Sequence, residues 1–319
     1  MNQQKSDALK ELEYLESFLK EKSWMEINET GKTILGKVYT NLKNLKNTDE
    51  EFLIPRFIAV YHNLMNILRP KNSSIKNERR IYFLSFGDAR LIRSLERIRR
   101  QAEEMDVFHE INCWTQDDID RDFWERWKHK IPFDGLDYKS SGFFIWKPQI
   151  VMQVLEKMND GDVLLYCDVG CHLHHYGGAR EMFWGYVDLL CKNETGVLCF
   201  IQNNNLERTW TKGDIFDYFG CRDKQEIYNT RQAMSGVIFF RKCEKSMDFV
   251  KKWRQVYHDS FELHDSETFN SPNLEGFVAN RCEQSTLSLL AKLNKVEFVE
   301  GAHTAEFPIT AARDKEYTF

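Results

Sequence analysis

The 319-residue sequence lacks the features that mark several classes of protein. No apolar run approaches the roughly 20 residues that a membrane span requires, and the first residues contain no apolar core of signal-peptide length. Basic residues number 44 and acidic residues 49, so there is no positive excess to hold a phosphate backbone. We therefore expect a cytoplasmic protein with no nucleic-acid partner, which could still associate peripherally with a membrane.

Two common nucleotide-binding motifs are also absent. Neither Gly-x-Gly-x-x-Gly nor Gly-x-x-x-x-Gly-Lys-Ser/Thr follows a predicted strand, which disfavours a dehydrogenase or a P-loop enzyme. Several of the eight cysteines, such as Cys167 and Cys199, lie inside apolar runs typical of buried thiols in a reducing compartment. Cys171 and His172 close to Cys167 could suggest zinc, but strand alternation turns Cys167 away from Asp168, and no second cluster at zinc-finger spacing follows.

The most informative stretch that is present is Asp160 to Cys171, DGDVLLYCDVGC. The apolar run Val163 to Cys167 has no polar residue to alternate with, so it predicts a strand buried on both faces, as in a parallel sheet. Asp168 follows at its carboxyl end, where an open α/β sheet forms its ligand crevice. The carboxylate could bind a ligand or a metal there, or it could cap a turn before Gly170.

The first 75 residues have the pattern of a helical appendage. Leucines recur at helical spacing from Leu9 to Leu19, and a wide apolar face runs from Phe57 to Leu68. The polar, Pro-led run Pro70 to Arg79 follows, so we divide the chain into an appendage over 1–75 and a larger domain over 76–319. The apolar face predicts packing against that domain or a homodimer through these helices.

The larger domain alternates apolar runs with helical patterns, which predicts an α/β fold with a mostly parallel sheet flanked by helices. We expect strands at Ile81–Phe86, Val107–Ile111, Val163–Cys167, Val197–Gln202, Ser235–Arg241 and Val296–Val299, and helices at Leu91–Glu103, from about Pro148 to Met158, at Lys245–Tyr257 and after Cys282.

Two basic features of this domain each have two interpretations. The predicted helix Leu91–Glu103 carries an arginine stripe that includes Arg93 and Arg97, which could bind anions or could be a solvated face diluted by Glu96. Lys147 lies at a predicted helix start, where a cation opposes the helix dipole; a bound anion would explain it, and so would simple solvation.

The order and spacing of these segments resemble the GT-A-fold glycosyltransferases of bacterial lipopolysaccharide and capsular polysaccharide synthesis. The stretches that carry the resemblance are IYFLSFGD, GFFIWKP, LLYCDVGC, WTKGDIF, MSGVIFFR and NRCEQSTLSLLAK. The resemblance implies a GT-A-like fold from about Ile81 onward. It also implies transfer of a hexose from a nucleoside-diphosphate sugar to a hydroxyl of a surface glycan or glycolipid, in a cytoplasmic protein that could contact the inner membrane.

The same resemblance implies roles for particular residues. Asp168 takes the place of the first acid of an Asp-x-Asp motif whose third position is Gly170 here, so it is expected to bind Mn²⁺ or Mg²⁺, with His303 as a second ligand. Asp168, Glu283 and Gln284 are expected to be catalytic. The residues expected to bind the donor are Phe86, Asp88, Lys147, Asp168, Gly170, Arg180, Ser235 and Gly236. Glu283 and Asp265 are both candidates for the base that an inverting reaction would need.

Other functions stay open at this point. The missing second acid would suit a catalytically silent protein that binds a sugar nucleotide or acts as a scaffold. A different nucleotide-using transferase on the same kind of sheet is a further alternative.

Overall fold

The computed structural model describes residues 79–175, 179–265, 267–300 and 308–316. The predicted appendage over 1–75, Gly177 and His303 lie outside these ranges. None of the helices in the described ranges is long and apolar enough to cross a lipid bilayer.

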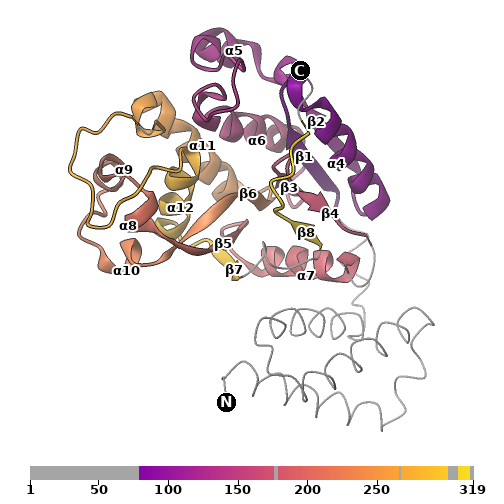
Figure 1. Ribbon diagram of the computed structural model, residues 1–319. Coiled ribbons are helices and arrows are strands. Elements are labelled where there is room, and N and C mark those ends of the chain that lie inside the picture. Colours follow the sequence, from indigo (N-terminus) through magenta and orange to yellow (C-terminus); the bar gives the residue numbers. More distant parts are fainter. Residues whose placement is uncertain (1–78, 176–178, 266, 301–307, 317–319) are drawn as a thin grey trace, which may run out of the picture.

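A six-stranded mixed sheet forms the centre of the described chain, in the order β2-β1-β3-β6-β5-β7 (Figure 1). The strands are β1 (Ile81–Phe86), β2 (Glu110–Trp114), β3 (Val163–Cys167), β5 (Val197–Leu206), β6 (Arg231–Arg241) and β7 (Glu297–Glu300). β1 is parallel to β2 and β3, and β5 is parallel to β7, whereas β6 runs antiparallel to β3 and β5. The predicted α/β sheet is therefore confirmed, with three of its five strand pairings parallel.

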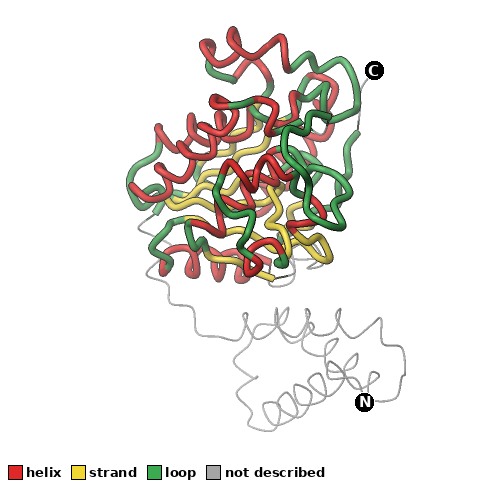
Figure 2. Tube along the Cα trace, turned by 90° about the vertical axis from the view of Figure 1, so that its left-hand side faces the viewer, coloured by secondary structure: helices red, strands yellow, loops and turns green. Residues whose placement is uncertain are grey.

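Helices cover both faces of this sheet, as Figures 1 and 2 show. Strand alternation sends Leu84 and Tyr166 into a core with α6 (Trp146–Lys157), α11 (Glu244–Asp259) and α12 (Glu283–Leu293). It sends Phe83 and Leu165 into a second core with α4 (Ile92–Met105) and α7 (Ala179–Lys192). Shorter helices are α5 (Arg121–Trp127), α8 (Glu207–Trp210), α9 (Gly213–Tyr218) and α10 (Gln225–Tyr228), with 3-10 turns η3 (Ala89–Leu91), η4 (Gln116–Asp118), η5 (Lys128–Lys130), η6 (Gly142–Phe144) and η7 (Phe261–Leu263).

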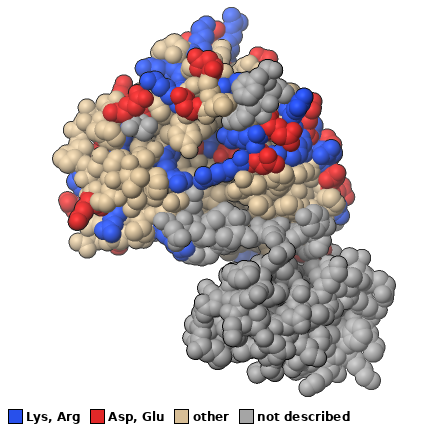
Figure 3. Space-filling view, in the orientation of Figure 1, with Lys and Arg blue, Asp and Glu red and all other residues tan. Residues whose placement is uncertain are grey.

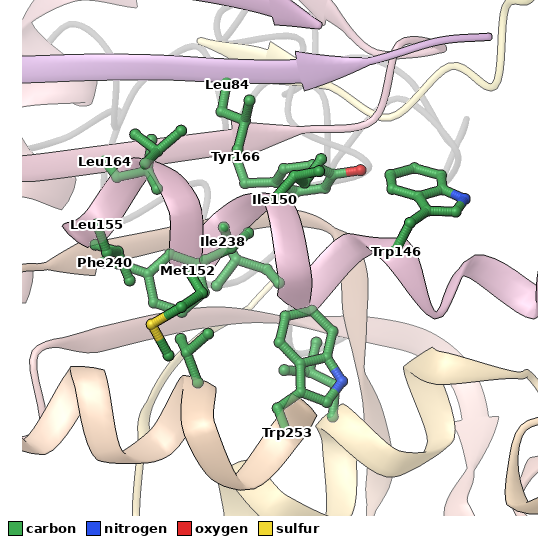
Figure 4. Close-up of a cluster of buried hydrophobic side chains, with 14 of the residues drawn as sticks. Leu84, Trp146, Ile150, Met152, Leu155, Leu164, Tyr166, Ile238, Phe240 and Trp253 are labelled. Carbon is green, nitrogen blue, oxygen red and sulfur yellow. The ribbon is translucent and has the colours of Figure 1, made fainter. Parts of the chain in front are cut away.

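Helix α6 connects the loop above the sheet to the central strand. Pro148 lies in the first turn of α6, where a backbone N–H would have no partner within the helix, so proline is tolerated. The apolar side chains of α6 pack between β3 and Trp253 of α11 (Figure 4). Gly142 just before it has φ +58°, and a Cβ there would lie 2.6 Å from a side-chain carbon of Ile131. The tight turn at Gly142 thus fixes the start of α6 and, with it, the position of Lys147.

The end of the described chain returns to the carboxyl end of β3. β8 (Ile309–Thr310) pairs with β4 (His172–Leu173), and the Asp314 N–H donates to the Gly170 carbonyl oxygen at 3.0 Å. The Arg97 guanidinium donates to the Asp314 carboxylate at 2.8 Å and to the Val169 carbonyl at 2.8 Å. Residues 311–316 are therefore tied directly over the loop that follows Asp168.

The contact between Arg97 and Asp314 also gives part of the arginine stripe on α4 a structural role. Arg97 holds the chain end and Arg90 pairs with Asp88, whereas Arg93 and Arg100 are exposed. Figure 3 shows Lys and Arg side chains on this side of the molecule interleaved with Asp and Glu. The stripe is thus partly structural and partly a mixed, solvated surface.

Most predicted elements lie where expected, and the second strand is the main correction. The prediction placed it at Val107–Ile111, but β2 spans Glu110–Trp114. Asp106 ends α4 in the left-handed conformation, and the buried Val107 belongs to the connection into the strand. β5 and β6 are also longer than predicted, because their polar ends continue the antiparallel ladder.

Candidate functional site

A cavity of about 370 Å³ opens at the carboxyl ends of β1 and β3 and is closed by the first turn of α12, the loop before α6 and the chain end. It brings together nearly all of the predicted site residues. Those that line it are Phe86, Asp88, Lys147, Asp168, Gly170, Ser235, Gly236, Glu283 and Gln284. Positions almost 200 residues apart in the sequence therefore meet in one cavity, as an α/β sheet brings strand ends together at one edge.

Asp168 lies at the centre of this site, directly after β3. Its Oδ1 atom accepts a hydrogen bond from the Tyr166 hydroxyl at 2.7 Å and pairs with the Lys147 ammonium at 3.1 Å. No described residue donates to Oδ2, and 43% of the side chain is exposed. One carboxylate oxygen is thus held by the protein while the other faces the cavity.

Lys147 and Glu283 form a buried ion pair beneath Asp168. The Lys147 Nζ lies 2.5 Å from Glu283 Oε1, and the two side chains are only 2% and 3% exposed. The Ser235 hydroxyl donates to the same Glu283 oxygen at 2.6 Å, and its carbonyl accepts from Lys147 at 3.2 Å. The anion that the sequence suggested for Lys147 is therefore supplied, within the protein, by these two carboxylates.

Lys147, Asp168 and Glu283 shift one another's pKa values. Burial alone would lower the pKa of Lys147, but Asp168 and Glu283 outweigh it, so this pKa is raised and the ammonium stays charged. Burial would raise the pKa of Asp168, but Lys147 and the Tyr166 hydroxyl hold it below its usual value. For Glu283, burial prevails over Lys147 and the pKa is raised.

Asp88 sits at the β1 end of the cavity and is occupied by its own loop. Its carboxylate accepts the backbone N–H of Arg90 at 2.9 Å and two guanidinium hydrogen bonds at 2.8 Å each. Arg90 in turn donates to the Gly135 carbonyl, so this pair joins the β1 loop to the loop before α6. Asp88 thus shapes the wall of the cavity from which Phe86 and Phe133 present aromatic rings.

The two predicted glycines lie where another residue would disturb the site. A Cβ on Gly236 would lie 2.9 Å from Asp168 Oδ2, and a Cβ on Gly170 would lie 3.1 Å from the Arg313 Cα atom. Since real Cβ contacts are longer than 3.0 Å, the first substitution would displace the carboxylate. Gly236 therefore makes room for the free oxygen of Asp168.

Two predicted candidates among the described residues, Arg180 and Asp265, do not line the cavity. Arg180 begins α7 and donates to the Glu104 carbonyl at 2.9 Å, away from the lining residues. Asp265 pairs with the buried Lys212 at 3.2 Å and accepts the Thr268 N–H at 2.9 Å. His303 lies outside the described residues. Of the two candidate bases, only Glu283 lines the cavity.

Sequence reasoning missed several residues of the cavity: Arg90, Tyr138, Trp210, Arg281, Arg313 and Lys315. Arg281 stands two residues before Glu283, so its closeness to the predicted pair could have drawn attention to it. Arg313 and Lys315 had no such signal, because contacts between segments distant in the sequence bring them here, namely the pairing of β8 with β4 and the contacts of Asp314 with Arg97 and Gly170.

The side chains that line the cavity provide only part of the ligand set that a divalent cation requires. Hard cations prefer oxygen ligands, and Asp168 Oδ2 is such a ligand with an open approach. In the described ranges, no three His, Cys, Asp or Glu side chains gather as a metal site would require. A cation here would bind Asp168, and substrate phosphate oxygens and water would supply further ligands.

Comparison with known proteins gives distant structural likenesses. No family model and no curated protein matches the sequence. A glycosyltransferase involved in glycosylation of the major capsid of PBCV-1 is 11% identical, with 72% of this chain and 93% of that chain covered and a TM-score of 0.40. Mouse xyloside xylosyltransferase 1 is 8% identical, covering 71% and 86%, with a TM-score of 0.39.

A third likeness is to the glycosyltransferase GlyE of Streptococcus pneumoniae TIGR4, which is 15% identical with a TM-score of 0.31. The alignment covers 70% of this chain but only 45% of GlyE, so the chain spans less than half of that protein's length. Identities and scores this low do not define a family for the chain. We therefore base the proposed function on the geometry of the cavity.

Proposed function

We propose that this protein is a glycosyltransferase that moves a hexose from a nucleoside-diphosphate sugar to a hydroxyl of a glycan or glycolipid acceptor. The observation that carries the proposal is the half-exposed carboxylate of Asp168, which is held at a strand end above the buried Lys147–Glu283 pair. One oxygen is fixed by the protein and the other faces the cavity. This is the arrangement expected for a carboxylate that binds a charged ligand or its cation.

The order of the lining residues along the sheet supports one orientation of the donor in our proposal. Phe86 ends β1 and Asp88 follows it, Asp168 follows β3 and Ser235 lies in β6, and these three strands are neighbours. In our proposal the nucleoside lies at the aromatic β1 end, the diphosphate lies beside Asp168, and the sugar lies against Ser235 and Gly236. Gln284 then faces the sugar from the first turn of α12.

Such a reaction develops negative charge on the leaving diphosphate, and fixed positive charges offset it. Lys147 sets the charge and position of Asp168, and Lys315 at the cavity wall is close enough to lower the pKa of Asp168 further. A bound Mn²⁺ or Mg²⁺ would act as a Lewis acid on the phosphate oxygens. Glu283 shares its Oε1 with Lys147 and Ser235, so its main role in our proposal is to position them.

We further propose that the protein acts at the cytoplasmic side of a membrane on which surface glycans are assembled, as the resemblance in its sequence implies. A helical appendage over 1–75 that packs on the domain or forms a homodimer stays a prediction.

A panel of nucleotide sugars tests this function. Wild-type protein would be incubated with UDP, GDP, CMP and dTDP sugars, with and without Mn²⁺ or Mg²⁺, and hydrolysis of the donor measured together with binding of each nucleotide. We expect turnover of one donor class, and His303→Ala reports whether that residue supports metal dependence. Binding without turnover would instead favour a catalytically silent sugar-nucleotide-binding or scaffolding protein, and neither binding nor turnover would contradict both.

A further inference from the structure

Two large side chains with apolar surface face solvent at the mouth of the cavity. Leu136 is 60% exposed and Tyr138 is 57% exposed, and both line the cavity. They lie in the connection 131–141 between η5 and η6. A single exposed apolar side chain needs no explanation, but two that line the same cavity are typical of a surface that a ligand covers.

The backbone of the connection 131–141 is held in place around these side chains. The Tyr138 carbonyl accepts the Phe143 N–H at 2.8 Å, which ties the connection to the turn before α6. Arg90 donates to the Gly135 carbonyl and so ties it to the end of β1. Because the backbone is fixed on both sides, binding a ligand here would require little further ordering of the protein.

A left-handed turn extends the aromatic surface from Tyr138 into the cavity. Gly142, Phe143 and Phe144 have φ values of +58°, +50° and +63°, which the two phenylalanines adopt at a cost in free energy. The Phe144 ring packs 5.7 Å from the ring of Tyr138 and 6.0 Å from that of Trp146, measured between centroids. Tyr138 is thus the exposed end of a row of rings that line the cavity.

We propose that Leu136 and Tyr138 form a subsite on which a sugar ring of the acceptor stacks. The C–H face of a pyranose is apolar and packs against an aromatic ring, while its hydroxyl groups stay available for hydrogen bonds. The Tyr138 hydroxyl lies at the edge of the same ring and can donate to a sugar hydroxyl or accept from one. The inference rests on the proposed function and adds to it the residues that select the acceptor, which they recognise by a sugar ring.

The position of Tyr138 favours the acceptor over the donor's nucleoside as the stacking partner. In the proposed orientation the nucleoside lies at the β1 end, where the buried rings of Phe86 and Trp146 pack with their centroids 4.0 Å apart. Burial lowers the pKa of Arg281, and Tyr138 is close enough to act in the opposite direction, so its ring lies toward the start of α12. A glycan that extends out of the cavity reaches this exposed ring without entering the nucleoside's end.

Methyl glycosides of galactose, glucose, mannose and N-acetylglucosamine are the probes for this subsite. Their binding to the full chain would be measured by saturation-transfer difference NMR in wild type, Tyr138→Ala, Tyr138→Phe and Leu136→Ala. Tyr218→Ala is the matched control, because Tyr218 is also partly exposed but donates to Asp259 and does not line the cavity. Circular dichroism would verify that every variant is folded.

We expect at least one glycoside to bind wild type, with the strongest saturation on the C–H protons of one face of its ring. Tyr138→Ala should weaken this binding about fivefold or more, because stacking on the ring is lost. Leu136→Ala should weaken it about twofold or more, because less apolar surface is covered. Tyr138→Phe should retain most of the affinity, and the control should bind as wild type does.

The titration is then repeated with UDP, GDP, CMP or dTDP at saturation. Glycoside binding that persists with a nucleotide bound, and that depends on the Tyr138 ring, supports a separate acceptor subsite. Displacement of the glycoside by the nucleotide, or loss of nucleotide binding in Tyr138→Ala, assigns the ring to the donor and overturns this inference while the proposed function stands. A panel in which no glycoside binds, or binding that neither Ala variant changes, also overturns it. Glycoside binding through Tyr138 without binding of any nucleotide supports the sugar subsite and contradicts the proposed function.

Discussion

The buried Lys147 ammonium should be essential to the stability of the site, and Lys147→Met tests this. Methionine has nearly the same length and no charge, so the variant leaves Glu283, which is 3% exposed, without its cation. Breaking a buried ion pair by removing one partner costs about 3–5 kcal/mol of the free energy of unfolding. Asp168 should add less to this cost, because its carboxylate is partly solvated.

Chemical denaturation at pH 8 would measure this loss, and Lys147→Met/Glu283→Gln would separate charge from packing. Since glutamine is neutral, the double variant should regain about 2 kcal/mol or more relative to the sum of the single variants. Lowering the pH should also reduce the loss of stability in Lys147→Met. Burial raises the pKa of Glu283, so the folded state binds a proton before the unfolded state does, and the loss shrinks as pH falls toward the ordinary carboxyl range.

The matched control is Lys245→Met, which removes an exposed ion pair with Glu194 and should change stability little. The reasoning is refuted if Lys147→Met costs less than about 1 kcal/mol, since an unpaired buried carboxylate must cost more. Strict additivity in the double variant would equally show that Lys147 and Glu283 do not act as a pair.

Three further predictions follow from the site and the core. Gly236→Ala should reduce turnover by about a hundredfold with little change in melting temperature, because its Cβ would displace Asp168 Oδ2; wild-type kinetics would contradict this. Gly170→Ala should loosen the chain end, because its Cβ would lie 3.1 Å from the Arg313 Cα atom, so hydrogen exchange of the Asp314 amide should speed up; unchanged exchange would count against it. Burial lowers the pKa of His264 to about 3, so stability should fall as pH drops below about 6, by about 1.4 kcal/mol per unit from this group. His264→Asn should lack that part of the slope in unfolding measurements, and parallel pH profiles would rule it out.

The sequence predicted the sheet well because burial on both faces leaves a strong local signal. Val163 to Cys167 is a five-residue apolar run, and it forms β3 at those bounds. The direction of β6 had no such signal, because a buried strand has the same composition whether it is parallel or antiparallel to β3. The sequence likewise could not tell that Lys147 would be buried, since its partners Asp168 and Glu283 are distant in the chain.

Sequence patterns predicted the site residues at strand ends, but not those that the end of the described chain brings to the cavity. Asp168, Ser235 and Glu283 follow or lie in elements with clear patterns, and the structure gathers them in one cavity. Arg313 depends on the short pairing of β8 with β4, which has only two residues in each strand. Arg180 shows the opposite case, because its helix was predicted correctly but its side chain binds a carbonyl of α4 instead of lining the cavity.

The most direct measurement is the rate of donor hydrolysis by Asp168→Asn. Asparagine has the shape of aspartate without its charge, and Asp160→Asn, in the exposed turn before β3, is the matched control. If the Asp168 carboxylate binds the donor or its cation, Asp168→Asn should lose on the order of a thousandfold in rate while keeping its melting temperature. Asp160→Asn should retain the wild-type rate. Equal turnover of the donor by wild type and Asp168→Asn would contradict the role assigned to the carboxylate at the end of β3.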